Sequence, residues 1–129
     1  MFPGGQNLRG LREQLGLTMR DVETASTRIA ERIQILGGVS IAMAPDVAEI
    51  TQIERPPRGR EEVPVQLSRL LDAHQVIIGH CRKLAKRAST LGDDGTNDMV
   101  ISDILRTNEL QVWFVSEHLV NMPLIKALG

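Results

Sequence analysis

The chain has 129 residues, of which 42% are hydrophobic, a formal net charge of −1 and one cysteine, Cys81. This length suits one domain with one core, and the hydrophobic fraction excludes global disorder. Aromatic residues make up only 2%, which favours helices packed through aliphatic side chains over a β-sandwich. A lone cysteine excludes an intrachain disulfide framework, and the slight negative charge argues against a strong nonspecific grip on nucleic acid.

Targeting signals are not apparent in the sequence. The N-terminal residues Met1–Gly5 lack the basic region and the apolar stretch of a secretory signal. No apolar run approaches the roughly 20 residues that span a bilayer. The sequence therefore predicts a cytoplasmic protein without a membrane segment.

The first predicted helix runs from about Asn7 to Leu36, because apolar residues recur there at spacings of three, four and seven. Gly37 and Gly38 then supply the left-handed residue that commonly ends a helix. The apolar stripe of this helix consists of Leu8, Leu11, Leu15, Val22, Ile29, Ile33 and Leu36. A short helix is expected from Pro45 to Ile53, and the basic segment from Arg55 to Arg60 is expected to be a loop.

The second long helix is predicted to begin near Pro64 and to end at Gly92. Its stripe consists of Leu67, Leu70, Leu71, His74, Ile77, Ile78, Cys81, Leu84, Ala85, Ala88 and Leu91. His74 is therefore expected to be a hydrogen-bonded core or interface histidine, and Cys81 a buried, inert thiol. His80 lies six residues from His74, so the two point in different directions and do not form a metal-binding pair. His118 is expected at a surface or an interface.

The third long helix is predicted from about Asn97 to Asn121, with Asp94 or Thr96 as its cap. Its core side consists of Val100, Ile104, Leu105, Val112, Val115 and Leu119. Pro123 is expected to break or kink the chain, with a short turn from Leu124 to Leu128. Three long helices and a short helix in a long connection predict an all-α bundle that forms a single domain over residues 1–129.

Several segments, taken in order, resemble one known family. Ala30-Glu31-Arg32 and Leu36-Gly37-Gly38-Val39 resemble the end of helix B in the DNA-protection-during-starvation (Dps) family of mini-ferritins. Leu70-Leu71-Asp72-Ala73-His74 resembles helix C, and Gly92-Asp93-Asp94-Gly95-Thr96 the turn between helices C and D. Trp113-Phe114 resembles the end of helix D. The resemblance covers nearly the whole chain.

The resemblance implies a ferritin-like four-helix bundle that assembles with copies of itself, often as a hollow dodecamer. It implies oxidation of Fe(II), storage of the ferric product and protection against oxidative stress, with iron as the bound metal. Some family members also coat DNA. For this chain we expect a homo-oligomer of two or more copies and weak, salt-sensitive DNA binding or none. Arg55, Arg58 and Arg60 form the basic cluster to test.

The chain departs from the family pattern at the ferroxidase site. Helix A has no counterpart here, and the family's first His ligand would fall just before Met1. The next positions, which the family fills with His, Asp, Asp and Glu, hold Arg12, Gly16, Thr27 and Glu31. Arg12 is a fixed cation and Gly16 has no side chain, so Glu31 is the sole remaining ligand of this type. We therefore expect a degenerate site and no iron oxidation above background.

Three acidic residues, Asp93, Asp94 and Asp98, cluster near the start of the third helix. One interpretation is helix capping and compensation of the helix dipole. The resemblance offers another, because acids in this region line the iron-entry pores of Dps shells.

Two alternatives to an iron-storage function remain open. The segment from Leu8 to Val22 resembles the start of a helix-turn-helix repressor, with Gly16 in the turn and Thr18 as the next cap. A bend between Gly16 and Thr18 would favour this DNA-binding module, and a continuous helix would oppose it. The other alternative is a non-catalytic structural or interaction subunit.

Overall fold

The computed structural model describes the backbone of residues 4–128 and the side chains of residues 10–119 other than 12, 14 and 18. Its regular elements are helices: α1 (Gly4–Ile35), α2 (Ala44–Ile50) and α3 (Val63–Thr90) come first. They are followed by α4 (Asp94–Met99), the π-helix η1 (Val100–Leu105) and α5 (Arg106–Leu128), which run into one another as a third long helix. The structure confirms the all-α fold.

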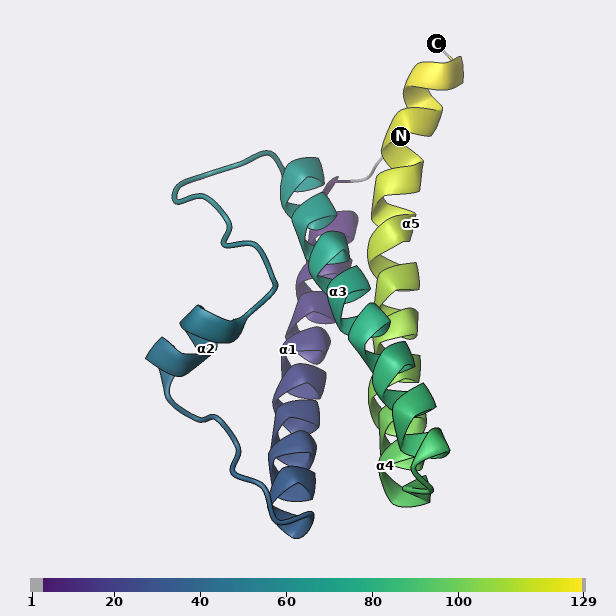
Figure 1. Ribbon diagram of the computed structural model, residues 1–129. Helices are drawn as coiled ribbons and strands as arrows, with labels where there is room; N and C mark the ends of the chain where they lie inside the picture. The colour runs from purple at the N-terminus through teal and green to yellow at the C-terminus, as the bar shows by residue number, and fades with distance from the viewer. Residues whose placement is uncertain (1–3, 129) are drawn as a thin grey trace.

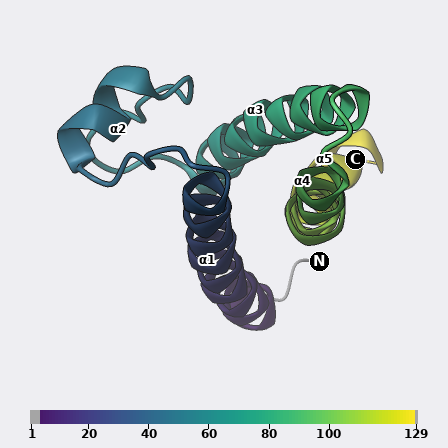
Figure 2. The same ribbon diagram turned by 60° about the horizontal axis from the view of Figure 1, so that its bottom comes forward.

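The three long helices form the body of the molecule, and α2 stands apart from them. Figure 1 shows α1 and α5 running roughly side by side while α3 crosses in front of them. In Figure 2, where the bottom of the molecule is tilted toward the viewer, α1, α3 and the α4–α5 rod lie around a common centre, with α2 on the outside. Helix α3 packs along α4, η1 and α5, and α1 contacts α5.

The buried side chains form two clusters along the α3–α5 pair. One contains Cys81 and Ala85 of α3 with Val100 and Ile104 of η1. The other joins Leu67 of α3 and Val115 of α5 to Leu11 of α1. Burial of these apolar groups is the main favourable contribution to folding, so the α3–α5 pair holds most of the core.

Parts of the apolar stripes predicted for the first and second long helices are exposed, which corrects the expectation that all their members are core residues. Val22 is 46% exposed and Ile29 38% in α1, and Leu84 is 47% exposed in α3. No helix among the described residues covers this side of α1 and α3, so the periodicity marked an apolar face without revealing what packs on it. The side chain of Leu8 lies outside the described residues.

Helix α1 is continuous through Gly16 and Thr18. The turn that a helix-turn-helix module requires at this point is therefore not formed, and the prediction of a continuous helix is confirmed. A glycine in the middle of a helix costs only about 1 kcal/mol, which the neighbouring helical residues can offset. The predicted end is also confirmed, because Gly37 has a φ of 87° in the left-handed region that favours glycine.

The short helix α2 begins as expected near Pro45 but ends at Ile50, three residues before the predicted end at Ile53. The hydroxyl of Thr51 accepts a hydrogen bond from the Ile53 N–H at 3.1 Å, and this local turn competes with further helix. All residues of α2 are exposed, including Val47 at 51% and Ile50 at 60%.

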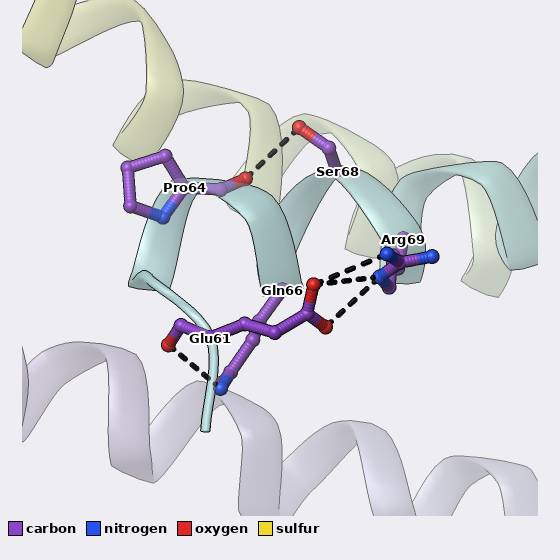
Figure 3. A network of polar contacts seen from close by, with 5 residues as sticks. All are labelled: Glu61, Pro64, Gln66, Ser68 and Arg69. Atoms are coloured by element: carbon purple, nitrogen blue, oxygen red, sulfur yellow. Dashed lines mark hydrogen bonds and ion pairs between the residues drawn. The ribbon is translucent and has the colours of Figure 1, made fainter. Parts of the chain in front are cut away.

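Side-chain contacts fix the start of α3 (Figure 3). Arg69 donates to both carboxylate oxygens of Glu61, with its Nε 2.9 Å from Oε1, and Gln66 donates to the Glu61 carbonyl at 3.1 Å. Ser68 donates to the Pro64 carbonyl at 2.9 Å. Glu61 therefore ties the preceding loop to the first turns of α3, where Pro64 lies as predicted.

The third long helix differs from its prediction in three ways. It begins at Asp94 rather than Asn97, because Asp93 is the N-cap and accepts a hydrogen bond from the Thr96 N–H at 3.1 Å. Neither Asp94 nor Thr96 is therefore the cap. The π-helical turn η1 was not foreseen. The backbone remains helical through Pro123 to Leu128, so the chain does not break at Pro123 and its last residues do not form a separate turn. Proline lacks one N–H and its ring crowds the carbonyl four residues earlier, so a kink at Pro123 stays a prediction. Of the helices described, none has the length and apolarity that a membrane crossing needs.

Candidate functional site

Gly16, Thr27 and Glu31, which the resemblance assigns to iron-ligand positions, lie on one face of α1. With about 100° of rotation per residue, Gly16, Arg20, Glu23, Thr27 and Glu31 follow one another along this face, which we call the donor face. Arg20, Glu23, Thr27 and Glu31 are exposed, whereas buried Leu11 lies on the opposite side of the helix. The donor face therefore points away from the core, and ligands from outside the bundle would be needed to complete a metal site there.

The side chains on the donor face are poor ligands for Fe(II). The Arg20 guanidinium lies over Gly16, with its Nε 3.4 Å from the Gly16 carbonyl oxygen. The Thr27 hydroxyl donates to the Glu23 carbonyl at 3.1 Å and is neutral. Glu23 lies two turns from Glu31, about 12 Å along the axis, which is too far for both to hold one ion. The side chain of Arg12 lies outside the described residues.

Within the described part of the chain, no group of three or more His, Cys, Asp or Glu side chains is placed to hold a metal ion. Glu31, the predicted remaining ligand, is therefore not part of such a group among the described residues. Its role in iron binding stays a prediction. Iron held for oxidation needs several converging carboxylates or imidazoles, and the described side chains of the donor face do not converge in this way.

The histidines occupy three different environments. His74 is 2% exposed, and its Nδ1 lies 2.9 Å from Oδ1 of Asn108, which confirms the hydrogen-bonded core histidine. His80 is exposed and lies 2.9 Å from Oε1 of Gln52, across the connection to α2. His118 is partly buried, with Nδ1 2.8 Å from the Phe114 carbonyl oxygen. His74 and His80 therefore hydrogen-bond to different partners, on α5 and in the segment after α2.

Cys81 is buried, as predicted, at 6% exposure in the cluster between α3 and η1. Burial raises the pKa of the thiol, because the charged thiolate loses hydration there. A thiol that resists ionisation is a weak nucleophile, so the site favours an inert packing residue.

A layer of polar side chains crosses the middle of the bundle. The Asn108 amide donates to the Ile104 carbonyl at 2.8 Å, which leaves its Oδ1 to accept from His74. Gln111, one turn further along α5, donates to the Asp21 carboxylate of α1 at 3.0 Å. Ile104 lies in η1, where the wider π-helical turn changes which backbone N–H groups and carbonyls are bonded. Its carbonyl accepts the hydrogen bond from the Asn108 side chain. This layer links all three long helices.

Of the three acids at the start of the third helix, Asp93 is engaged within the chain. Its Oδ2 accepts from the Thr96 hydroxyl at 2.6 Å and its Oδ1 from Arg32 Nη2 at 2.8 Å. Arg32 Nε also donates to the Thr96 hydroxyl oxygen at 3.0 Å. Hydrogen bonds from the Thr96 side chain and backbone, with a smaller effect of Arg32, lower the pKa of Asp93. We call Arg32, Asp93 and Thr96 the clasp, since they join the end of α1 to the start of α4.

Asp94 and Asp98 are exposed on the same short helix. Asp98 accepts a hydrogen bond from the Ser102 hydroxyl at 3.1 Å. The capping interpretation is therefore confirmed for Asp93 alone, and a pore role for the three acids stays a prediction that depends on a shell.

Sequence reasoning missed two features. The clasp joins the segments Ala30-Glu31-Arg32 and Gly92–Thr96, which the resemblance treated as separate motifs. A local sequence pattern does not predict a contact between residues this far apart. The second feature is a basic stripe on α3, formed by the exposed residues Arg82, Lys83, Lys86 and Arg87. The spacing of these four cations is visible in the sequence, although the loop with Arg55, Arg58 and Arg60 is the more obvious basic cluster. Arg82 pairs with Glu109 at 3.7 Å.

Comparisons with known proteins agree with this architecture. A protein-family model described as "Ferritin-like domain" matches residues 1–125, so the chain belongs to the ferritin-like family. DpsC from Streptomyces coelicolor has a similar structure, with a TM-score of 0.74 and 51% identity, covering 84% of this chain and 61% of DpsC. Dps from Thermosynechococcus elongatus gives a TM-score of 0.79 at 25% identity, covering 86% of this chain and 69% of its own. The resemblance to the Dps branch is thereby confirmed.

Two curated relatives are similar in sequence. A nutrient stress-induced DNA-binding protein of Nostoc is 31% identical over 105 residues, which is 81% of this chain and 57% of the relative. An uncharacterized protein of the bpoA2 5′ region in Kitasatospora aureofaciens is 49% identical over 65 residues, which is 50% of this chain and 43% of the relative. The chain thus spans about half the length of the curated relatives that it matches.

Proposed function

We propose that this chain is a Dps-type ferritin-like subunit that takes part in iron sequestration and protection against oxidative stress, with iron as its cargo. We propose further that its own residues do not form a complete ferroxidase site. The observation that carries the second part is the donor face of α1, where a single carboxylate, Glu31, occupies the family's helix-B ligand positions. Fe(II) oxidation would then depend on ligands from another molecule or would not exceed background.

The electrostatics of the donor face support this proposal. Arg20 lies over Gly16, so positive charge occupies the place where the family has a carboxylate. One exposed carboxylate cannot offset the cost of removing water from a divalent ion. Exposed Glu31 therefore supports at most a loose, hydrated contact with iron.

The first experiment measures Fe(II) oxidation by hydrogen peroxide through the absorbance of the ferric product. Wild type, Glu31→Ala and the matched control Glu49→Ala, which removes an exposed carboxylate of α2, are compared with a protein-free blank. We expect the three proteins to oxidise iron at the blank rate. Fast oxidation in wild type and Glu49→Ala that Glu31→Ala abolishes would show that a working site exists around Glu31 and would contradict the proposal.

A gain-of-function variant tests the same proposal by restoring a carboxylate to the donor face. Thr27→Asp places a second carboxylate one turn from Glu31 on the same face of α1. We expect this variant to bind Fe(II) or Mn(II) at least about tenfold more tightly than wild type, a difference of about 1.4 kcal/mol. Equal binding by the two proteins would mean that the missing carboxylates do not limit metal affinity.

Iron sequestration itself is tested separately, by gel filtration after loading with Fe(II) and peroxide. Iron that elutes with a protein assembly of two or more copies supports the proposed function. A monomer at micromolar concentration that elutes without iron contradicts it. The exposed apolar side of α1 and α3 supports association, since large exposed apolar patches usually mark interaction surfaces.

A second candidate function is weak contact with the DNA backbone, which the basic stripe on α3 favours. Lys83, Lys86 and Arg87 are exposed cations within two turns of helix. Each phosphate contact lowers the slope of log K against log salt by about 0.9. We expect weak, salt-sensitive binding of duplex DNA, with a slope smaller by about 2 in the variant Lys83→Gln/Lys86→Gln. The control Arg58→Gln/Arg60→Gln in the loop is expected to change it less. Equal slopes in all three proteins would show that the basic stripe does not contact the DNA backbone.

A further inference from the structure

The segment between α2 and α3 is an exposed loop with a basic centre. Residues 51–62 are not helical, and Figure 1 shows this segment standing out to the side of α1 and α3. Its central part carries three exposed arginines, Arg55, Arg58 and Arg60. Among the described side chains, none is an ion-pair partner of these three. The acidic residues of the segment flank this part: Glu54, Glu61 and Glu62.

Side-chain contacts hold the loop at both ends. Gln52 Oε1 lies 2.9 Å from His80 Nε2, which fixes the first residues of the segment against α3. Arg69 donates to both carboxylate oxygens of Glu61, which fixes the last residues and neutralises the acid nearest to the arginines. A loop that is anchored in this way loses less conformational freedom when it binds another molecule, so its contacts contribute more to affinity.

Two prolines and a glycine shape the centre of the loop. Pro56 and Pro57 hold φ at about −65° and disfavour helix in the residue before each. Gly59 has a φ of 98°, in the left-handed region that favours glycine, and lies at a bend between Arg58 and Arg60. A Cβ at Gly59 would meet no atom within 4 Å, so the space around the bend is open. Two arginines thus flank a residue without a side chain at an accessible bend.

The chemistry of these arginines matches one surface of duplex DNA. A guanidinium has only N–H donors. The minor groove of A·T pairs presents only acceptors, adenine N3 and thymine O2, whereas each G·C pair adds the amino donor of guanine. A·T tracts also have a narrow minor groove with an enhanced negative potential that attracts arginine. A helix about 10–12 Å wide cannot enter a groove about 6 Å wide, but a single stretch of loop can.

We propose that Arg58 and Arg60 insert into the minor groove of A·T-rich duplex DNA, with Gly59 between them. The missing Cβ at Gly59 lets the backbone approach the groove, and the two guanidinium groups donate to the acceptors on its floor. The minor groove of A-form RNA is wide and shallow and does not enclose such a loop. This base-edge contact differs from the phosphate contact proposed for the stripe on α3, and it depends on neither that contact nor iron binding.

The test is fluorescence anisotropy of the full chain at low salt with three labelled duplexes of equal length. One is A·T-rich, one is G·C-rich, and the third has the G·C-rich sequence with inosine in place of guanosine. Inosine lacks the guanine amino group, so the third duplex has an A·T-like minor groove and a G·C-like major groove. We expect the A·T-rich and inosine duplexes to bind at least about fivefold more tightly than the G·C-rich duplex. Equal affinity for all three, an inosine duplex that binds like the G·C-rich one, or binding to none would overturn the proposal.

A matched pair of variants assigns the preference to the loop. Arg58→Gln/Arg60→Gln alters two exposed side chains, and we expect it to bind the three duplexes with equal affinity. The control Lys83→Gln/Lys86→Gln removes the same charge from α3 and is expected to keep the preference while binding all three more weakly. Circular dichroism checks that both variants fold. The salt slope due to the stripe is measured on the G·C-rich duplex, where the loop contributes least. An A·T preference that survives in folded Arg58→Gln/Arg60→Gln would overturn the proposal.

Discussion

The α3–α5 pair and helix α1 are held in the molecule by different kinds of contact. Nearly all the buried apolar side chains lie between α3 and the η1–α5 rod, among them Val100 at 1% and Val115 at 0% exposure. Among the residues of α1 whose side chains are described, Leu11 is the buried one. The two regions share one helical pattern in the sequence but differ in how much of their apolar face is covered.

Besides the packing of Leu11, Leu15 and Ala25 on the two clusters, helix α1 is held by polar groups spaced along its length. Gln111 reaches Asp21, Arg28 pairs with Asp103, and Arg32 joins the clasp. Partly exposed polar contacts contribute about 1 kcal/mol or less each, whereas a buried aliphatic side chain contributes more. The α3–α5 pair therefore supplies most of the apolar stabilisation, and polar contacts help to position α1 against it.

Truncating one isoleucine in each region should show the difference most clearly, as a difference in the free energy of unfolding. Ile104→Ala removes a side chain that is 4% exposed, and Ile29→Ala one that is 38% exposed. We expect Ile104→Ala to lower the free energy of unfolding by about 2–5 kcal/mol, and Ile29→Ala by less than about 1 kcal/mol. Urea denaturation measures both. Equal losses would mean that α1 is buried against another molecule under the conditions used.

Thiol accessibility compares the same regions without relying on equilibrium unfolding. Cys81 lies in the core of the α3–α5 pair, and burial raises its pKa. We expect it to react at least about tenfold more slowly with a disulfide reagent than the engineered thiol of Cys81→Ala/Ile29→Cys on α1. The rate is followed by absorbance at low denaturant. Comparable rates would show that the core cluster opens as readily as the exposed face of α1.

The clasp is expected to contribute less than the core. Thr96 is 7% exposed, and its hydroxyl both accepts from Arg32 and donates to Asp93. Thr96→Val keeps the shape and removes both bonds, so we expect a loss of about 1 kcal/mol in unfolding free energy. Amide hydrogen exchange near the C-terminal end of α1 should rise several-fold, while exchange in α5 should not change. Uniform acceleration in both helices would mean that the clasp stabilises the whole fold.

The sequence predicted the long helices because periodicity, glycine stops and a proline start are local signals. Gly37 and Pro64 lie where these signals indicated. The third helix was less well predicted. Its cap, Asp93, precedes two other plausible caps, and the choice among them depends on a side-chain geometry that includes Arg32 from another helix. A π-helical turn has no local pattern in the sequence.

The candidate site was predictable only by position. The alignment with the family motifs put Gly16, Thr27 and Glu31 at the ligand positions, and rotation along α1 does place them on one face. One member of the polar layer could be predicted, because His74 interrupts an apolar stripe. Its partner Asn108 could not, because it lies on another helix. Contacts of this kind follow from the packing of α3 against α5, which the sequence pattern leaves undetermined.

The smallest expected effect is a pH dependence that arises from Asp93. Its pKa is lowered in the folded chain by hydrogen bonds from Thr96 and, to a smaller extent, by Arg32. The ionised carboxylate is thus favoured by folding, so its contribution is fully present above the pKa of the unfolded chain, near pH 4. As the pH falls through the folded-state pKa, protonation removes the acceptor and the contribution is lost. We expect wild type to be more stable than Asp93→Asn at pH 7 and the difference to shrink below about pH 4. Urea denaturation at stepped pH measures it, with Asp94→Asn, which removes the exposed neighbouring carboxylate, as the control. If wild type and Asp93→Asn lose stability in parallel as the pH falls, the clasp does not titrate through Asp93, and the polar attachment of α1 to α4 would rest on Arg32 and Thr96.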